Sequence, residues 1–97
     1  MAFVQVMDVQ TDKFDEIQAL RKEWDGKTAG ERTTRRRLIT RDRNDPNRYL
    51  IIVEFDSYES AMENSNRPET QELASKMEAL TTSITFADLD VIEDLGD

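Results

Sequence analysis

Apolar and β-branched residues gather at four places along the chain, in the alternating or continuous patterns typical of β-strands. The expected strands cover residues 3–7, 33–42, 48–55 and 84–92. The clearest of them is 48–55, because both of its faces are apolar. The second and third strands are joined by Asn44, Asp45, Pro46 and Asn47. These residue types favour a tight turn, so we expect a hairpin there.

Between the first and second strands, apolar residues recur every three or four positions, which predicts a helix. Phe14, Ile17, Leu20 and Trp24 form its apolar stripe. Thr11 or Asp12 is expected to cap the start of this helix, because their side-chain oxygens can accept hydrogen bonds from its free N–H groups. Asp25 and Gly26 are expected to end the helix, since glycine tolerates the left-handed conformation common at helix ends.

A second helical region lies between the third and fourth strands. It begins near Glu59, breaks near Ser65 and Asn66, and restarts at Pro68, a residue suited to a first helical turn. Leu73, Met77 and Leu80 continue the stripe after the break. The order of elements is therefore β-α-β-β-α-β.

This order predicts an α+β fold of the ferredoxin-like type, in which an antiparallel four-stranded sheet carries both helices on one face. With 97 residues, the chain is long enough for one hydrophobic core only. We therefore expect a single domain spanning residues 1–97.

The other face of this sheet would be open and also apolar. Leu50 and Ile52 lie on it in the third strand, and Val4, Val6, Leu89 and Val91 are further candidates. An exposed apolar face of this kind favours cover by a second copy, so we expect a homodimer. RNA-recognition domains instead carry stacking aromatics on this face, and a net charge of -8 opposes nucleic-acid binding. We expect no nucleic-acid partner.

Composition removes several classes of chemistry. The chain has no cysteine and no histidine, which excludes thiol nucleophiles, thiolate metal sites and imidazole bases or ligands. Glu59 and Glu63 share a helix face, but two carboxylates alone make a weak metal site. We expect no metal and no cofactor.

The longest aliphatic run, 50–53, is far too short to span a membrane, and the N-terminal stretch lacks the basic region of a signal peptide. A cytoplasmic location is expected.

Positive charge is concentrated in one segment. Residues 31–48 contain seven arginines and three acids, although the chain as a whole carries 13 basic and 21 acidic side chains. Arg35, Arg36 and Arg37 stand in sequence within the second strand. They can stabilise an anionic intermediate or pair with acidic residues of a partner subunit.

The chain resembles the dimeric α+β barrel proteins of the antibiotic biosynthesis monooxygenase type along nearly its whole length. The resemblance is carried by residues 3–7, by the segment 49–55, and above all by 59–69, with its Asn-Ser-x-x-Pro break. This family includes cofactor-independent oxygenases of aromatic polyketides, quinol oxygenases and heme-degrading enzymes. The resemblance implies a pocket between the helices and the sheet, with mainly apolar walls.

The resemblance also implies roles for six residues. Asn64, Gln5 and Tyr49 would orient or polarise a substrate, and Trp24, Met62 and Phe55 would shape the pocket. Each of the polar residues has a structural alternative. Gln5 can bond backbone, Asn64 can cap the helix at the break, and Tyr49 can turn its hydroxyl to water. Trp24 can equally belong to the core.

The heme-degrading branch does not fit this sequence. Its axial histidine falls near Glu72 and its pocket tryptophan near Met62, so both are replaced here. The function expected is therefore a cofactor-independent monooxygenase acting on a small aromatic or quinol-type substrate. The alternative is a non-catalytic homodimer of the same fold that binds a small hydrophobic ligand or another protein.

Overall fold

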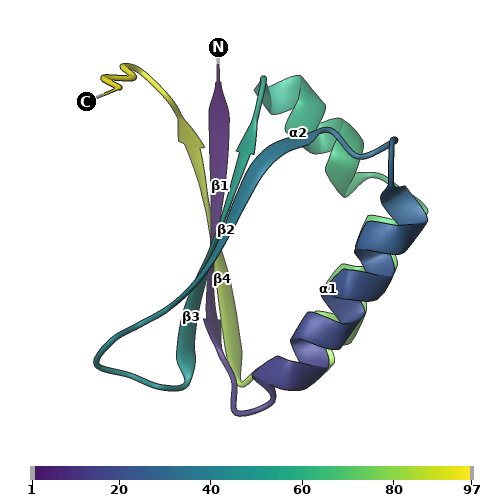
Figure 1. The fold of residues 1–97 in the computed structure, drawn as a ribbon, viewed down its shortest axis with the longest axis vertical. Helices are drawn as coiled ribbons and strands as arrows, with labels where there is room; N and C mark the ends of the chain where they lie inside the picture. Colours follow the sequence, from purple (N-terminus) through teal and green to yellow (C-terminus); the bar gives the residue numbers. More distant parts are fainter. Residues whose placement is uncertain (1, 97) are drawn as a thin grey trace.

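Four antiparallel strands form one sheet in the order β2-β3-β1-β4 in the computed structural model, which describes residues 2–96. The strands are β1 (Phe3–Gln10), β2 (Thr34–Arg41), β3 (Arg48–Phe55) and β4 (Ser83–Asp90). Three helices, α1 (Phe14–Thr28), α2 (Tyr58–Ser65) and α3 (Pro68–Ala79), lie on one side of the sheet, which Figure 1 shows edge-on. The predicted ferredoxin-like arrangement is confirmed.

The strand register fixes which side chains face the helices. β1 pairs with β3 and β4 so that Met7 lies opposite Ile51 and Phe86. Because residues directly opposite one another in a sheet point to the same side, all three belong to the helix-facing surface. Phe3, Gln5 and the other odd-numbered positions of β1 point the same way.

The core is divided between the two ends of the sheet. At one end Phe3 and Phe55, which are paired, pack with Val53 and Ala61. At the other end a second cluster holds Val9, Ile17, Tyr49 and Met77. The middle of β1, at Gln5 and Met7, lies between these clusters. This division leaves space beneath the helices in the centre of the molecule.

The predicted break in the second helical region separates α2 from α3. The Ser57 hydroxyl caps α2 by accepting a hydrogen bond from the Ser60 N–H at 3.1 Å. The helix ends at Ser65, and Pro68 opens α3. The break allows α2 to end with Asn64 buried, whereas α3 continues alongside α1.

Several predicted boundaries differ from the structure, and strand β1 runs to Gln10 rather than ending at residue 7. Helix α1 runs through Gly26 to Thr28, and the left-handed glycine is Gly30, with φ of 81°. An exposed glycine inside a helix costs only about 1 kcal/mol, which packing of the stripe outweighs. Helix α1 begins at Phe14 with Lys13 as its N-cap residue and no side-chain cap, so the predicted cap by Thr11 or Asp12 is wrong. Thr11 Oγ1 instead accepts a bond from the Lys13 N–H just before the helix. Strand β4 ends at Asp90, and Ile92 beyond it is 91% exposed.

The second face of the sheet carries no helix. The register places Val4, Val6, Leu50, Ile52 and Leu89 on it. Ion pairs flank this apolar area: Arg48 binds Asp8 and Asp42 at 2.9 Å each, and Arg36 approaches Glu54 at 3.7 Å. Val91 lies beyond the end of β4. No helix among residues 2–96 is long and apolar enough to cross a membrane.

Candidate functional site

A cavity of about 510 Å³ lies between the helix-facing side of the sheet and helices α1 and α3. This volume falls in the range of small-molecule sites, roughly 300–1,000 Å³. Its walls are mainly apolar and come from every strand and from α1 and α3: Met7, Ile17, Trp24, Ile39, Ile51, Val53, Phe55, Leu73, Ala74, Met77, Ile84 and Phe86. Phe86 is 56% exposed, so the cavity reaches solvent beside β4.

Asn64 supplies a buried amide to this cavity. It lies in the last turn of α2, is 7% exposed, and lines the cavity wall. Its Oδ1 atom is fully buried and accepts no hydrogen bond from residues 2–96. Leaving a buried polar atom unpaired costs about 1–3 kcal/mol, so this amide is a polar group that the described fold does not satisfy. Asn64 does not cap the helix break through its side chain.

Gln5 is the second amide in the cavity wall. It faces the helices from the centre of β1 and lies opposite Val53 and Asp88. Its Nε2 donates a hydrogen bond to Asp88 Oδ1 at 3.1 Å. The side chain therefore has a carboxylate partner on the neighbouring strand, and its carbonyl end is available to the cavity.

Trp24 forms both core and cavity wall. The side chain is 6% exposed, and its Nε1–H donates to Thr70 Oγ1 of α3 at 3.0 Å. This bond ties α1 to α3 and fixes the plane of the indole ring. The ring presents a flat apolar surface to the cavity.

The remaining predicted pocket residues are distributed unevenly. Phe55 lines the cavity from β3 while packing in the first core cluster. Met62 is half-buried against that cluster and does not line the cavity. Tyr49 lies in the second cluster, where its ring stacks on Phe14 with centroids 3.8 Å apart. The structure thus brings Gln5, Trp24, Phe55 and Asn64 together around one cavity and leaves Tyr49 and Met62 outside its lining.

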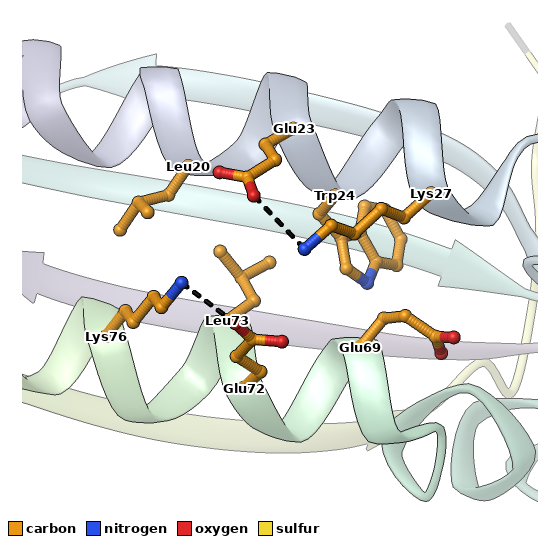
Figure 2. A pocket seen from close by; sticks show the side chains of 8 residues that line it. All are labelled: Leu20, Glu23, Trp24, Lys27, Glu69, Glu72, Leu73 and Lys76. Atoms are coloured by element: carbon orange, nitrogen blue, oxygen red, sulfur yellow. Dashed lines mark ion pairs between the residues drawn. The ribbon is translucent and has the colours of Figure 1, made fainter.

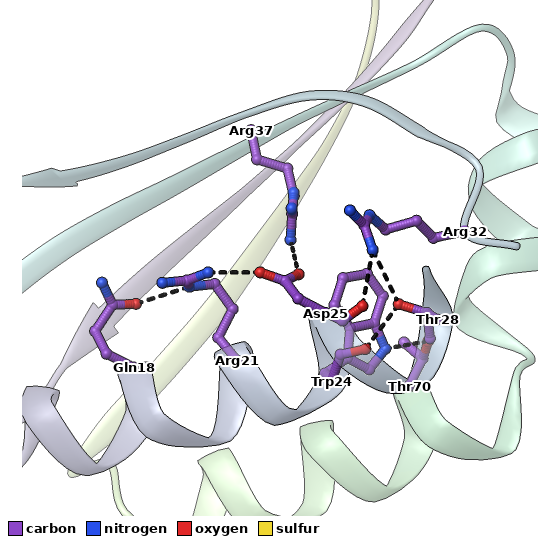
Figure 3. A network of polar contacts seen from close by, with 8 residues as sticks. All are labelled: Gln18, Arg21, Trp24, Asp25, Thr28, Arg32, Arg37 and Thr70. Atoms are coloured by element: carbon purple, nitrogen blue, oxygen red, sulfur yellow. Dashed lines mark hydrogen bonds and ion pairs between the residues drawn. The ribbon is translucent and has the colours of Figure 1, made fainter. Parts of the chain in front are cut away.

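Charged side chains line one rim of the cavity, between α1 and β2. Arg37 of β2 and Arg21 of α1 both bind the carboxylate of Asp25, at 2.5 Å and 2.6 Å (Figure 3). Burial alone would raise the pKa of Asp25, but the hydrogen bond and charge of Arg37, together with Arg21, hold it below its ordinary value. Asp25 is therefore ionised near neutral pH.

Several cavity residues were not singled out from the sequence. Gln18 and Arg21 each follow a stripe position of α1 by one residue, and Thr70 and Gln71 lie near the start of α3. Polar residues that border an apolar stripe lie at the edge of the buried face, and this signal could have found them. Nothing in the sequence shows that Arg37 reaches Asp25 across the fold.

The outer surface between α1 and α3 holds a small hollow. Its volume is about 20 Å³, and the ion pairs Lys27–Glu23 at 3.1 Å and Lys76–Glu72 at 2.9 Å flank it (Figure 2). These pairs are exposed links within each helix, worth little individually. Among residues 2–96 no three Asp, Glu, His or Cys side chains are grouped to hold a metal ion.

Solved structures share this architecture along its whole length. A variant of SnoaB, a cofactor-independent oxygenase from Streptomyces nogalater, superposes with a TM-score of 0.84, at 14% identity over 99% of this chain and 98% of its own. The fold is that of the antibiotic biosynthesis monooxygenases. A candidate member from Caulobacter crescentus gives a TM-score of 0.81 at 14% identity, covering 95% and 91% of the two chains. Another candidate, from Chloroflexus aurantiacus, gives 0.77 at 15% identity, covering 99% and 98%.

The predicted resemblance is thereby confirmed at the level of the fold. At these identities a shared fold does not carry the activity with it, because one fold hosts many functions. No protein-family model matches the sequence, and no curated protein matches it at a significant level. Function therefore has to be argued from the cavity and its residues.

Proposed function

We propose that this protein is a cofactor-independent monooxygenase that oxidises a small aromatic or quinol-type substrate in the cavity. The observation that carries the proposal is the amide of Asn64 in a largely apolar cavity wall, with an Oδ1 that no residue of 2–96 pairs with. Such a wall suits a flat apolar molecule, and one buried amide suits a single oxygen substituent. The fold shared with an oxygenase from Streptomyces nogalater supports the same assignment.

The proposed chemistry requires an electron-rich substrate, because the substrate itself must supply electrons to dioxygen. A phenol hydroxyl, or the CH2 group of an anthrone, loses a proton to water, and the negative charge that reaches the substrate oxygen is stabilised by a hydrogen bond from the Asn64 amide. An amide presents a donor and an acceptor side by side, so it can hold the neutral hydroxyl and the anion in turn. Gln5, whose carbonyl oxygen accepts no hydrogen bond from residues 2–96, orients a second polar group.

Dioxygen then completes the reaction as the oxidant. The substrate carbanion transfers electrons to O2 and forms a C–O bond, giving a hydroperoxide once a proton is taken up. Loss of water converts a CH2 group to C=O, so one oxygen atom of O2 enters the product and the other leaves as water. The apolar walls and Trp24 keep the reactive carbon away from bulk solvent. Tyr49 packs in the core, and we assign it no step.

Replacing Asn64 with alanine tests this assignment. The Asn64→Ala variant is expected to lose about 100-fold or more in kcat with an anthrone or hydroquinone substrate, as loss of an oxyanion donor does elsewhere. The matched control is Asn66→Ala, since Asn66 is an exposed asparagine two positions away at the end of the same helix. Steady-state oxygen uptake measures both variants against the parent.

Three outcomes are distinguishable in this comparison. A selective loss in Asn64→Ala supports the proposal. Equal activity in all three proteins removes Asn64 from the mechanism. Saturable binding without oxygen uptake by the parent favours the non-catalytic binding protein instead.

We further propose that the protein is a homodimer in which the open sheet face is covered by a second copy. Leu38 and Leu89 on the two edge strands of this face are 38% and 47% exposed, and Leu50 and Ile52 lie between them on β3. The ion pairs at the two ends of the area provide a polar rim. A two-fold pairing would bury the same apolar surface on both copies.

A further inference from the structure

A hollow of about 390 Å³ adjoins the cavity and is lined by arginines. Arg21, Arg32, Arg35, Arg36 and Arg37 contribute to its walls, and no carboxylate does so among residues 2–96. Arg21 and Arg37 also line the apolar cavity, as do two uncharged residues of β2. The hollow is therefore a continuation of the cavity past its charged rim.

The charge of the inner arginines is only partly neutralised. Arg21 and Arg37 share the single carboxylate of Asp25. Arg32 forms no ion pair with residues 2–96: its Nη1 donates to the Asp25 backbone carbonyl at 3.1 Å and to Thr28 Oγ1 at 3.5 Å. Three guanidinium groups thus face one carboxylate, a local charge of +2 in a chain of net charge -8.

The outer two arginines are balanced. Arg35 pairs with Asp56 at 3.2 Å and Arg36 with Glu54 at 3.7 Å, and all four side chains are exposed to water. Exposed pairs of this kind add little to binding or stability. The excess positive charge belongs to the inner three residues.

These inner guanidinium groups keep donors available. Arg21 uses Nε and Nη1, whereas Arg32 and Arg37 use Nη1, in their hydrogen bonds to the protein. Within the described part of the chain, the Nη2 group of each makes no hydrogen bond. Guanidinium donors are suited to carboxylates, which they bind through two parallel N–H···O bonds.

Trp24 lines the cavity and contacts two of the arginines that line the hollow. The guanidinium carbon atoms of Arg32 and Arg37 lie 5.8 Å and 5.5 Å from the centre of its ring, within the range of cation–π attraction (Figure 3). Stacking restricts both side chains, so little entropy is lost when they bind an anion. A flat ring system against Trp24 would hold a substituent close to these arginines.

We propose that this hollow is an anion subsite that binds a carboxylate on the substrate, so that the ligand of the cavity is an aromatic carboxylic acid. The proposal rests on the proposed function for the apolar part of the ligand. A purely structural role explains Asp25 with Arg37, which ties α1 to β2. It also explains the bond of Arg32 to a carbonyl in the last turn of α1, but not the unpaired charge of Arg32. That residue adds a charge that no carboxylate of residues 2–96 neutralises.

A pair of probes that differ only in charge tests the subsite. Anthracene-2-carboxylate and anthracene-2-carboxamide have nearly the same size and are both fluorescent, so direct titration measures their Kd values. The parent protein is expected to bind the carboxylate at least about tenfold more tightly, with a preference that falls as salt is added. Arg32→Gln is expected to remove most of this preference while leaving the Kd of the carboxamide unchanged.

The control variant is Arg43→Gln, which changes the net charge equally at an exposed position in the β2–β3 turn. Retention of the preference in Arg43→Gln, with its loss in Arg32→Gln, supports the subsite. Equal binding of the two probes by the parent, or equal effects of the two variants, overturns the subsite but leaves the apolar cavity intact. Failure of the parent to bind either probe overturns the cavity assignment as well.

Discussion

At the scale of single residues, Asp25 organises the charged rim of the cavity. Its carboxylate is 24% exposed and holds Arg21 from its own helix and Arg37 from β2. The pair within the helix follows the spacing of four residues and could be predicted from sequence. The pair to β2 could not, because a register irregularity between Thr34 and Arg36 helps decide which arginine faces the helices.

Replacing Asp25 with asparagine is expected to lower the free energy of unfolding by about 1–2 kcal/mol near neutral pH, since charged hydrogen bonds to two arginines are lost. The pKa of Asp25 is lowered in the fold, so its contribution is complete above the ordinary value of 3.8 and is lost as pH falls through the folded pKa. Urea unfolding at several pH values measures the difference between parent and variant. A difference that stays constant into the acid range contradicts the ionic role.

At the scale of elements, the apolar patterns predicted every strand and the interruption between α2 and α3. Strand 48–55 was predicted at its observed boundaries because hydrophobic pairing on both faces leaves little freedom of register. The end of α1 was not, since Gly26 resembles a helix stop in sequence but lies inside the helix. Packing of Trp24 and Thr28, one on each side of the glycine, determines the true end, and this is a tertiary effect.

Gly26 and Gly30 lie near the C-terminal end of α1, and their replacement by alanine is expected to change stability in opposite directions. Gly26→Ala is expected to stabilise the protein by about 0.5–1 kcal/mol, because the site is helical and the added methyl group meets no atom within 4 Å. Gly30→Ala is expected to destabilise it by about 1 kcal/mol, because φ of 81° strains any side chain. Thermal unfolding of both variants measures these effects. Effects of the same sign would place the end of α1 elsewhere.

At the scale of the whole molecule, the fold followed from the order of elements, whereas the cavity did not. Chain order and hydrophobic period leave few topologies, and the ferredoxin-like one is a recurrent solution for this order. The cavity arises because the core is concentrated at the two ends of the sheet, which depends on packing of residues distant in sequence. Gln5 and Asn64 were identified as pocket residues through the family resemblance, while the arginine-lined hollow, which depends on that packing, was not.

The open sheet face leads to a prediction about assembly. Ile52→Asp is expected to convert a dimer to a folded monomer, because it puts a charge into the centre of the proposed interface without touching the helix-side core. Ala19→Glu on the exposed surface of α1 makes the same change in net charge and serves as the control. Light scattering after gel filtration gives the mass of each. A parent that is monomeric at micromolar concentration contradicts the interface.

The most direct test of the account is oxygen consumption by the purified protein after treatment with a metal chelator, supplied with an anthrone as the only other reactant. We expect a saturable rate, one molecule of O2 consumed per molecule of quinone formed, and one oxygen atom of O2 retained in the product. A rate equal to the uncatalysed background, or a rate restored only by added metal or flavin, would contradict a cofactor-independent oxygenase.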